Sequence, residues 1–535
     1  MKVAQDVFNQ PPPLAGHNLY LSNRPLLEAL EREGAGWARE QATEFGQLLS
    51  GEPGEWARLA NENPPRLRTH DRFGNRIDEV EFHPAWHSLM RTSVEQGLHA
   101  VSWREQRPGA HVARAALFFL ASQIEQGHTC PMSMTHAAVP ALRAQPELAA
   151  EWEPRLTSLA YDPVLRPAAD KRGALCGMAM TERQGGSDVR ANTTRAVRLT
   201  DGEYELTGHK WFCSAPMCDA FLVLAQAKAG LSCFLLPRVL SDGTRNGFRI
   251  QRLKDKLGDR SNASSEIELE CAWARLVGEE GRGVPTIIEM VNHTRLDCVL
   301  GTAAVMRAAV EQATHHTAYR SAFGRLLADQ PLMQNVLADL CLESEAATLT
   351  GMRLAGAYDR GEAAFARIAT AVSKYWVCKR GPGHAAEALE CLGGNGYVEE
   401  SGMPRLYRQQ PLQSIWEGSG NVICLDVLRA LARNTETGEA FLAECRAAAG
   451  ADPRLDAWLT TLEPDLLDPD EASARRLVER MGLALQASLL VRFGEPAAAD
   501  AFCASRLGPD GGLAYGTLPA GADTAAITDR HRPRI

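Results

Sequence analysis

Between Gly173 and Gly283 the chain changes texture, and this change constrains the fold more than any other feature of the sequence. Short apolar or alternating runs follow one another there: LCGMAMTE, TTRAVRL, EYELTG, AFLVLAQA, SCFLLP and SSEIELE. Runs of this length and period indicate β-strands. Asp201-Gly202 joins two of them, and an Asp-Gly pair in that position is typical of a hairpin. The segment therefore predicts a small antiparallel sandwich or barrel.

Helical patterns occupy the chain on both sides of this segment. HVARAALFFLASQIEQG has the apolar spacing of a packed helix, and the run from Val284 keeps helical periodicity to Gly324, which we expect to cap it. Further helices are expected at about 331–358, 362–390 and 419–433, and long helices with short connections indicate a bundle. The predicted fold is mainly α with a central antiparallel β domain, in the order helical domain, sheet, helical bundle.

A chain of 535 residues is too long for one core, so several domains are expected. The first 60 residues, punctuated by Pro and Asn, predict an extended arm with one helical stretch near Leu26–Leu30. The Gly-rich end, from about Gly508, is expected to be loose. The predicted segments are an arm (1–60), a helical domain (61–172), the β domain (173–283), a helical bundle (284–434) and an added helical domain (435–535).

Charge and composition exclude several classes of protein. The formal net charge is -9, from 57 basic and 66 acidic residues, which argues against an extended nucleic-acid surface but leaves room for a local basic patch. The N-terminus lacks the apolar segment of a secretory signal, and no apolar run approaches a membrane span, so we expect a cytoplasmic protein. The 13 cysteines are scattered without a C-x-x-C pair, and adjacent His315 and His316 point apart on a helix; no metal site is expected.

Two motifs in the β segment could face a ligand. MTERQGGSDV (180–189) offers hydroxyl groups and successive backbone N–H groups at a Gly-Gly turn, which can cradle an anion or a flat polar ring. An ordinary β-turn is the alternative. HKWFCS (209–214) places Trp211 and Phe212 on opposite faces of a strand, so that one belongs to the core and the other could flank a cofactor. Simple packing is the alternative.

Three further motifs combine polar or acidic groups with glycine. RSAFG with Gln334 (320–334) and CLGGNGY (391–397) place donors beside glycines, although Gly393 could equally be a helix C-cap. SIWEGSGN (414–421) places a tryptophan and a carboxylate on a loop with two glycines. Small residues let a backbone approach a ligand closely.

In this order along the chain, the motifs resemble the acyl-CoA dehydrogenase family of flavoproteins. The resemblance covers about Gly173 to Arg433. The segments FNQPPPL, NLYLSN, EGAGW, FHPAWHSLM, CPMSMTHAAVP, KDKLGDRSNASSEIE and SIWEGSGNVICLDVL are similar to one branch of that family, the alkylation-response flavoproteins of AidB type. That branch has an N-terminal arm and an added C-terminal helical domain, as this sequence does.

The resemblance implies FAD as cofactor and a homotetramer as the assembly. It implies that the isoalloxazine ring is held by Met180, Thr181, Gly186 and Ser187 and covered on its other side by Trp211, Phe212 and Ser214. The adenine and pyrophosphate, often those of a neighbouring subunit, would be reached by Arg320, Phe323, Gln334, Gly393 and Gly394. The loop lying against the flavin would contribute Ile415, Trp416, Gly418, Ser419 and Asn421.

The resemblance also implies a catalytic base. Acyl-CoA oxidation needs a group that removes the α-proton, and a partly dry carboxylate with a raised pKa suits that task. The family uses two alternative positions for it, and Thr294 occupies one of them. Glu417 is then the catalytic candidate, with Arg295 on the substrate side. Arg183 departs from the family, which has proline there.

For the added domain the resemblance implies binding of double-stranded DNA in the response to alkylation. Residues 451–535 hold 9 Arg and no Lys against 13 Asp and Glu, so a local patch would be needed. Arg475, Arg476 and Arg480 share a predicted helix and are the candidates, although a solvated face with Glu471 and Glu479 fits equally well. The expected function is an FAD-containing alkylation-response protein that binds DNA and has weak acyl-CoA dehydrogenase activity. The alternatives are a metabolic short- or branched-chain acyl-CoA dehydrogenase and a non-catalytic flavoprotein that shields DNA.

Overall fold

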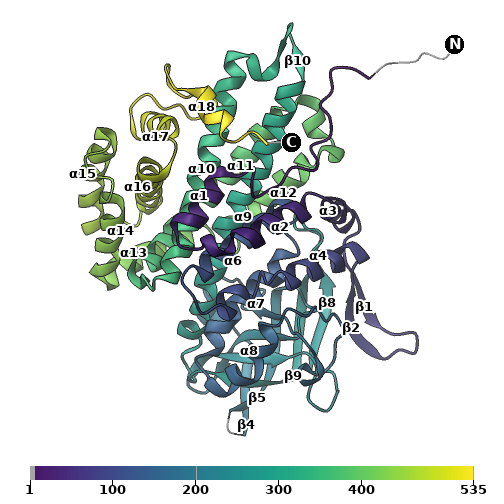
Figure 1. The fold of residues 1–535 in the computed structure, drawn as a ribbon. Coiled ribbons are helices and arrows are strands. Elements are labelled where there is room, and N and C mark those ends of the chain that lie inside the picture. Colours follow the sequence, from purple (N-terminus) through teal and green to yellow (C-terminus); the bar gives the residue numbers. More distant parts are fainter. Residues whose placement is uncertain (1–6, 201, 534–535) are drawn as a thin grey trace, which may run out of the picture. The chain divides into compact units, whose positions relative to one another are not determined.

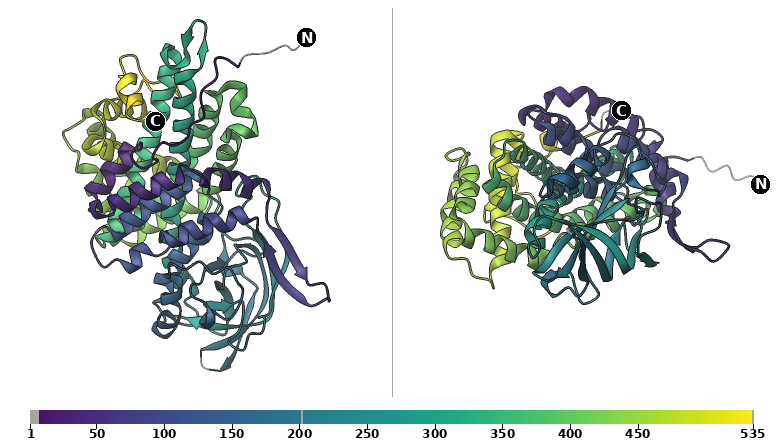
Figure 2. Two further views of the ribbon diagram at one scale, coloured as in Figure 1. Left: turned by 45° about the vertical axis from the view of Figure 1, so that its right-hand side comes forward. Right: turned by 90° about the horizontal axis from the view of Figure 1, so that it is seen from below.

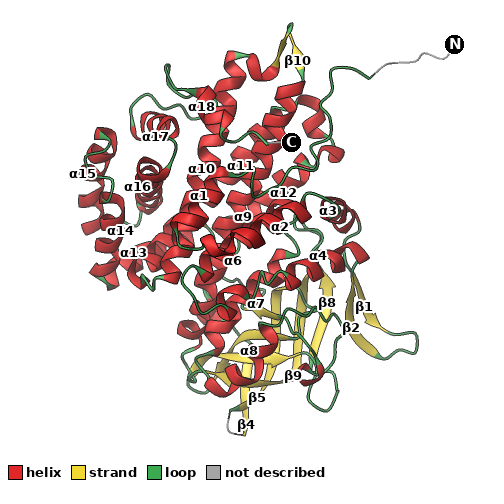
Figure 3. Cartoon of the chain, viewed as in Figure 1, coloured by secondary structure: helices red, strands yellow, loops and turns green. Residues whose placement is uncertain are grey.

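The computed structural model describes residues 7–200 and 202–533, which divide into two compact units. The helical unit comprises the described residues of Met1–Gly51, His111–Gln123 and Cys298–Ile535. The sheet unit comprises the described residues of Glu52–Ala110 and Ile124–Asp297. Figure 3 shows the strands of the large sheet in yellow and the helices in red.

The sheet unit is built on a 7-stranded sheet with the order β3-β6-β4-β5-β9-β7, with β8 paired to β9. A further pairing of β6 with β7 closes five of the strands into a barrel. The pairs are antiparallel except those of β6 with β3 and β4, so the predicted antiparallel domain is correct for most of the sheet. Asp201, in the predicted hairpin turn, lies outside the described residues. The strands are β3 (Cys176–Ala179), β4 (Arg195–Thr200), β5 (Glu203–Ser214), β6 (Ala220–Ala227), β7 (Gly230–Pro237), β8 (Phe248–Leu253) and β9 (Ser264–Val277).

Helices and one hairpin complete the sheet unit. Helix α7 is almost entirely buried and packs against β3. The hairpin of β1 (Arg66–His70) and β2 (Arg76–Glu81), which the sequence patterns did not predict, packs against β8 and extends beyond the sheet edge (Figure 2). The helices are α3 (Pro53–Glu62), α4 (Pro84–Glu95), α5 (Val101–Arg104), α7 (Thr129–Leu142) and α8 (Pro146–Leu156).

The helical unit has a bundle in which α11 packs against α10, α12 and α13 (Figure 1). The helices predicted at 331–358, 362–390 and 419–433 are confirmed. The prediction for Gly324 is wrong: α9 ends at Tyr319, and Gly324, at φ +77°, turns the hairpin of β10 (Ser321–Ala322) and β11 (Arg325–Leu326). The helices are α6 (Ala110–Ile124), the part of α9 (Gly283–Tyr319) from Cys298 on, α10 (Pro331–Asp359), α11 (Ala363–Glu390), α12 (Met403–Gln413) and α13 (Gly420–Arg433).

The first 60 residues are less extended than the sequence suggests. In the described part, residues 7–22 form an arm without helix or strand, and helices α1 (Arg24–Arg32) and α2 (Arg39–Leu49) follow. Asn23 caps α1 by accepting a hydrogen bond from the backbone N–H of Leu26. Leu26, Ala29 and Leu30 are buried on one face, which explains why this stretch packs instead of remaining an arm.

The C-terminal region is helical, as predicted, but its end is ordered. Leu518 is buried, and its backbone N–H and C=O both bond to the side chain of Asn335. The last helix packs against α10. Nowhere in residues 7–200 or 202–533 is a helix long and apolar enough to cross a membrane. The helices are α14 (Thr435–Arg446), α15 (Pro453–Leu467), α16 (Ala474–Phe493), α17 (Pro496–Phe502) and α18 (Thr524–Asp529).

Candidate functional site

The loop after β3 is fixed by a buried ion pair between Glu182 and Lys210. Both side chains are 0% exposed, and the ammonium lies 2.8 Å from Oε1 of Glu182. The carboxylate also accepts hydrogen bonds from the backbone and hydroxyl of both Thr193 and Thr194. Because a buried carboxylate is stable only when it is fully bonded, these contacts lock the MTE motif to β5. Motif reasoning did not single out either member of the pair.

The predicted flavin-ring residues of this loop lie close together. The backbone N–H of Trp211 donates to the carbonyl of Thr181 over 2.8 Å. A Cβ added to Gly186 would lie 2.3 Å from Oγ1 of Thr181, so glycine is needed for the turn to fold back against this hydroxyl. Met180 is half-buried and Ser187 is exposed. The loop thus presents polar groups and backbone on an open side.

Trp211 and Phe212 do not lie on opposite faces of a regular strand. The β5–β9 register shifts between Lys210 and Cys213, which is a β-bulge. Both rings consequently approach one ammonium group: Nζ of Lys254 lies 3.9 Å from the ring centre of Trp211 and 4.4 Å from that of Phe212. Bulges re-aim side chains, and they are common beside functional sites. Phe212 is 49% exposed and Ser214 is half-buried, so the bulge presents an aromatic surface that a flat ring could cover.

Arg183, at the family's proline position, is directed away from the loop backbone. Its guanidinium lies 3.3 Å from Oε1 of Glu268 and 5.8 Å from the ring of Trp211. Its backbone N–H donates to Nε2 of His209. The substitution adds a cation beside the aromatic pair and leaves the turn itself intact.

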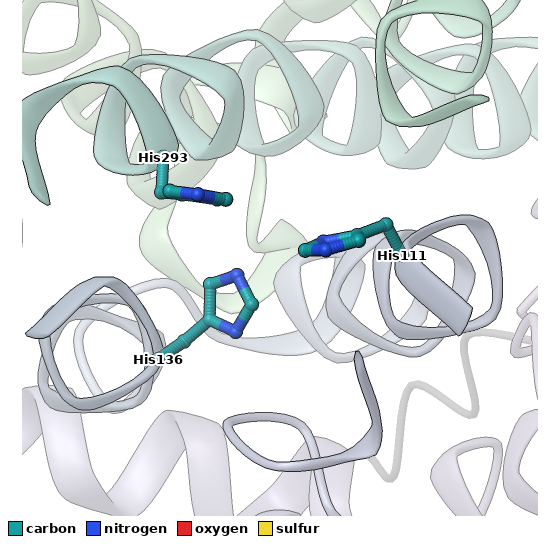
Figure 4. A group of neighbouring side chains, drawn as sticks. All are labelled: His111, His136 and His293. Atoms are coloured by element: carbon teal, nitrogen blue, oxygen red, sulfur yellow. The ribbon is translucent and has the colours of Figure 1, made fainter. Parts of the chain in front are cut away.

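Arg295 and Thr294 are both buried on α9. The hydroxyl of Thr294 donates to the carbonyl of Val291, as in an ordinary helix, and an alcohol cannot serve as a base at this position. The residue before Thr294 is His293, and its ring stands edge-on to that of His136 at 5.2 Å (Figure 4). Trp103 stacks on His136 at 4.9 Å, so this cluster is an aromatic packing unit within the sheet unit; His111, also labelled in Figure 4, belongs to the helical unit.

In the helical unit, Arg320 and Phe323 flank the β10–β11 hairpin. Phe323 has φ +53° and is 99% exposed at the hairpin tip. With Gly324 also at positive φ, the pair forms the tight turn that suits a two-residue hairpin. Gln330 donates to the carbonyl of Ala322 and ties the hairpin to the start of α10, where Gln334 is half-buried.

The predicted glycine pair lies on an open surface just after α11. Gly393 adopts φ +59°, and an added Cβ at Gly393 or Gly394 would meet no atom within 4 Å. The space beside their backbone is therefore free for a ligand. The C-cap of α11 is Cys391, so Gly393 is not the helix cap that the sequence allowed. Its positive φ explains the glycine, and its contact with a cofactor stays a prediction.

Residues 415–418 form the turn between α12 and α13, and Glu417 adopts φ +58° in it. A non-glycine residue in this region is strained, and such strain is concentrated at functional sites. The turn is held from both sides: Nε1 of Trp416 donates to Gln413, and Nζ of Lys374 donates to the carbonyl of Gly418 over 2.5 Å. Glu417 is half-buried, whereas Ile415, Ser419 and Asn421 are exposed.

Comparison with known proteins identifies the fold and its relatives. Residues 9–163 match the N-terminal domain of the adaptive response protein AidB. Residues 177–272 and 281–432 match the middle and C-terminal domains of acyl-CoA dehydrogenases. AidB of Escherichia coli (strain K12) is 48% identical over 514 residues, which is 95% of each chain. The chain belongs to the acyl-CoA dehydrogenase family, in its AidB branch.

Two solved structures resemble this AidB-type chain along most of its length. The apo-form of Bd2924 is 28% identical with a TM-score of 0.84, covering 92% of this chain and 100% of its own. ACDH-11 of Caenorhabditis elegans, solved in complex with C11-CoA, is 26% identical with a TM-score of 0.84, covering 100% and 94%. The predicted fold class, including the C-terminal helical domain, is thereby confirmed.

Members of this family depend on FAD, and FAD is the cofactor of this AidB-type chain. The observed surfaces fit it: the exposed ring of Phe212 beside half-buried Trp211 and a polar turn in the sheet unit, and open glycine backbone with a guanidinium in the helical unit. Glycine permits close approach of a cofactor, and arginine pairs with phosphate. The role of each predicted residue remains a prediction.

Lys374 is a functional candidate that motif reasoning missed. Its side chain is 1% exposed, and its ammonium bonds to the carbonyl of Gly418. Within residues 7–200 and 202–533, no carboxylate lies within 4.0 Å of this ammonium. A buried cation without a counter-ion is costly and is therefore a mark of function. A lysine in the middle of a helix, far along the chain from the turn, carries no local signal of this contact.

The three arginines of α16 are placed unequally. Arg475 donates to the hydroxyl of Tyr375 over 3.1 Å, and Arg480 pairs with Asp465 and donates to Thr461. Arg476 is exposed and has no hydrogen-bond or ion-pair partner in the described part of the chain. A surface groove of about 480 Å³ runs here, lined by Trp458, Thr461, Arg476, Glu479, Arg480 and Leu483.

Proposed function

We propose that this protein is an FAD-dependent member of the adaptive response to DNA alkylation that retains acyl-CoA dehydrogenase chemistry, with Glu417 as the base. One observation carries the proposal: Glu417 is held at φ +58° on a turn fixed from both sides, and Thr294 occupies the alternative position. Strain of this kind is kept where a side chain must be presented in one direction. Acyl-CoA is the proposed substrate class, supported by the complex of ACDH-11 with C11-CoA.

The proposed chemistry requires one proton acceptor from this chain. Bound FAD supplies the acceptor for the hydride that leaves the β-carbon of the substrate. The carboxylate of Glu417 takes the α-proton, and the electron pair of that C–H bond forms the new Cα=Cβ bond. The partly buried hydrogen bonds of Trp416 and Gly418 keep the carboxylate from turning away during this transfer.

Replacing Glu417 by Gln tests this role. The amide keeps the shape of the side chain but cannot accept the proton, so turnover of acyl-CoA should fall at least about a hundredfold while FAD remains bound. The measurement is anaerobic reduction of the bound flavin by a panel of acyl-CoAs. Glu400→Gln, an exposed change in the same unit, is the control. Unchanged flavin reduction in Glu417→Gln would show that another group is the base.

The proposal includes double-stranded DNA as a partner, bound through α16. It is supported by the match to the adaptive response protein AidB and by the unpaired Arg476 beside a groove. Arg475 and Arg480 already have partners, so Arg476 is expected to carry most of the phosphate contact. Removing all of α14–α18 would expose the faces of α10 and α11 on which they pack, so a point variant is the better test.

Arg476→Glu should weaken duplex binding several-fold. It should also reduce the steepness of the salt dependence, because a protein that makes one phosphate contact fewer releases fewer counterions from the DNA when it binds. Fluorescence anisotropy with a labelled duplex at several salt concentrations measures both effects. Arg66→Glu in β1, an exposed arginine of the sheet unit, is the matched control. An equal loss of affinity in the two variants would place the DNA contact elsewhere or make it unspecific.

A homotetramer is also part of the proposal. Several large apolar side chains of the helical unit are exposed, and where such side chains adjoin one another they mark contacts with other chains. They are Tyr319, Phe323, Leu326, Leu332, Tyr397, Val398 and Tyr407. Analytical ultracentrifugation of the FAD-loaded protein tests this assembly, and Phe323→Ser should shift the distribution to smaller species if the hairpin tip is part of the interface.

Two rival functions remain distinguishable. A metabolic short- or branched-chain acyl-CoA dehydrogenase would turn over its substrate rapidly and bind no DNA at physiological salt. A non-catalytic flavoprotein that shields DNA would bind duplex but leave the flavin oxidised with every acyl-CoA. The retained Glu417 turn favours the proposed function over the second rival, and the groove on α16 favours it over the first.

A further inference from the structure

Three residues of the N-terminal arm, Asn9, Gln10 and Pro12, are tied to segments far along the chain in the same unit. Asn9 pairs with Ser321 twice: its amide donates to the carbonyl over 2.9 Å, and its Oδ1 accepts from the N–H over 2.7 Å. The side-chain amide thus makes the same pair of hydrogen bonds to β10 that the backbone of a neighbouring strand would make. Asn9 has φ +55°, a conformation that asparagine tolerates better than most residues, which explains why this residue type suits the position.

The next arm residues extend these contacts. Asn395, beside the open glycine pair, donates to Oε1 of Gln10 over 3.3 Å. The ring of His315, on the last turns of α9, bonds to the carbonyl of Pro12 over 2.7 Å. The arm therefore crosses from the segment that follows α9 to the segment that follows α11. These are the two places where the resemblance puts the phosphate end of FAD.

The contact with Arg320 shows what the arm does there. Nη1 of Arg320 donates to the backbone carbonyl of Asn9 over 2.7 Å. No carboxylate of the described residues pairs with this guanidinium. A carbonyl orients a guanidinium without cancelling its charge, whereas a carboxylate would do both. The guanidinium therefore keeps its positive charge, and its other N–H groups can donate to an anion.

We propose that the N-terminal arm is a positioning element of the FAD site, with Asn9 holding Arg320 ready for the pyrophosphate. This inference rests on the role of Arg320 in FAD binding that the proposed function includes. An arginine side chain loses rotamer entropy when it is immobilised. If the arm fixes it beforehand, that loss is already met in the folded protein, and FAD binds more tightly for the same contacts.

The test is a double-mutant cycle on FAD affinity, measured by flavin fluorescence during titration of the apo-protein. Asn9→Gly removes the side-chain amide that fixes residue 9 on Ser321, so the backbone carbonyl that orients Arg320 is no longer held in place, while glycine still tolerates the positive φ. The variant should raise the Kd for FAD about tenfold. Asn9→Asp keeps the shape but adds a charge that competes for Arg320, so it should raise the Kd further and flatten its salt dependence. In Arg320→Ala the same Asn9→Gly change should add little, because Asn9 acts through Arg320.

Asn18→Gly is the matched control, since Asn18 also holds the arm by its amide but bonds to Thr43, Tyr20 and Leu21 instead of the FAD segments. It should leave the Kd for FAD unchanged. Additive effects of Asn9→Gly and Arg320→Ala, or an unchanged Kd in Asn9→Gly, would overturn the inference while leaving FAD binding intact. Failure of the proposed FAD role looks different: the unaltered protein would not bind FAD, or Arg320→Ala would bind it normally.

Discussion

Lys210→Met removes the ammonium group that pairs with buried Glu182 and should destabilise the sheet unit by about 3–5 kcal/mol, the usual cost of leaving one charge of a buried pair alone. Lys210 donates to Glu182 over 2.8 Å and to the carbonyl of Leu224 over 2.7 Å, and methionine can donate to neither. The four bonds from Thr193 and Thr194 remain, so the loss should fall in the lower part of that range.

The double variant Glu182→Gln with Lys210→Met should recover much of the loss. It removes both charges at once, and the amide oxygen can still accept from one of the two threonines, which bond to different oxygens of the carboxylate. If the double variant is no more stable than Lys210→Met, the cost does not come from an unpaired charge, and the reasoning is refuted. Lys228→Met, an exposed lysine in the same unit, should change stability by less than about 0.5 kcal/mol.

The pH dependence gives a second check on the same pair. Burial alone would raise the pKa of Glu182, but the bonds from Lys210, Thr193 and Thr194 outweigh it and hold the pKa well below its ordinary value. Glu182 therefore contributes stability above its unfolded pKa, about 4.3, which is lost as the pH falls further. Lys210→Met removes the ammonium group that does most to offset the effect of burial, so the pKa of Glu182 rises. Protonation of Glu182 then removes the unpaired buried charge. The difference between the two proteins should shrink on acidification from pH 7 to pH 5.

Hydrogen exchange of the amides of Thr193 and Thr194 is the suitable assay, because a chain of two units need not unfold in one step. Their N–H groups donate directly to Glu182, so they report on this loop alone. Exchange should accelerate in Lys210→Met, and the FAD affinity should fall with it, because the same loop presents Thr181 and Gly186. Unchanged exchange at both amides would show that the ion pair does not stabilise the loop.

Three other changes have definite expected outcomes. Lys374→Met should leave FAD bound but lower acyl-CoA turnover at least about tenfold, because the turn that carries Glu417 loses its hydrogen bond at the carbonyl of Gly418. Steady-state rates measure this, and an unchanged rate would contradict it. Glu125→Gln should cost about 1–3 kcal/mol at pH 7, because the buried carboxylate accepts bonds from His128, Gly127 and Ser261. Burial alone would raise the pKa of Glu125, but together these bonds lower it to about 2. The unaltered protein should therefore lose stability between about pH 4.5 and 2, and the variant should lose less over the same range. Acid titrations followed by circular dichroism measure both. Arg480→Ala should lower the melting temperature and Arg476→Ala should not, since only Arg480 lies over Trp458 and pairs with Asp465.

The sequence was sufficient where one local pattern determines the outcome. The switch between a period of two and a period of 3.6 located the sheet and the long helices, because each period reflects which face of an element is buried. Prediction from the sequence failed where contacts with another segment of the chain decide the local structure. Gly324 ends no helix, because the chain after Tyr319 pairs with itself in a hairpin. Trp211 and Phe212 approach the same cation, because β5 bulges against β9, and no residue within the HKWFCS motif signals this.

For the site, the sequence by itself determined which residue types stand at the motif positions, including the carboxylate at Glu417 and the hydroxyl at Thr294. Only the tertiary structure decided how they are held. The ion pair of Glu182 with Lys210, the bond from Lys374 to Gly418 and the clamp of Asn9 on Arg320 and Ser321 join segments 28 to 312 residues apart. Such contacts leave no periodic trace in the sequence, because they depend on which elements pack together and on the loss of water around the groups they join.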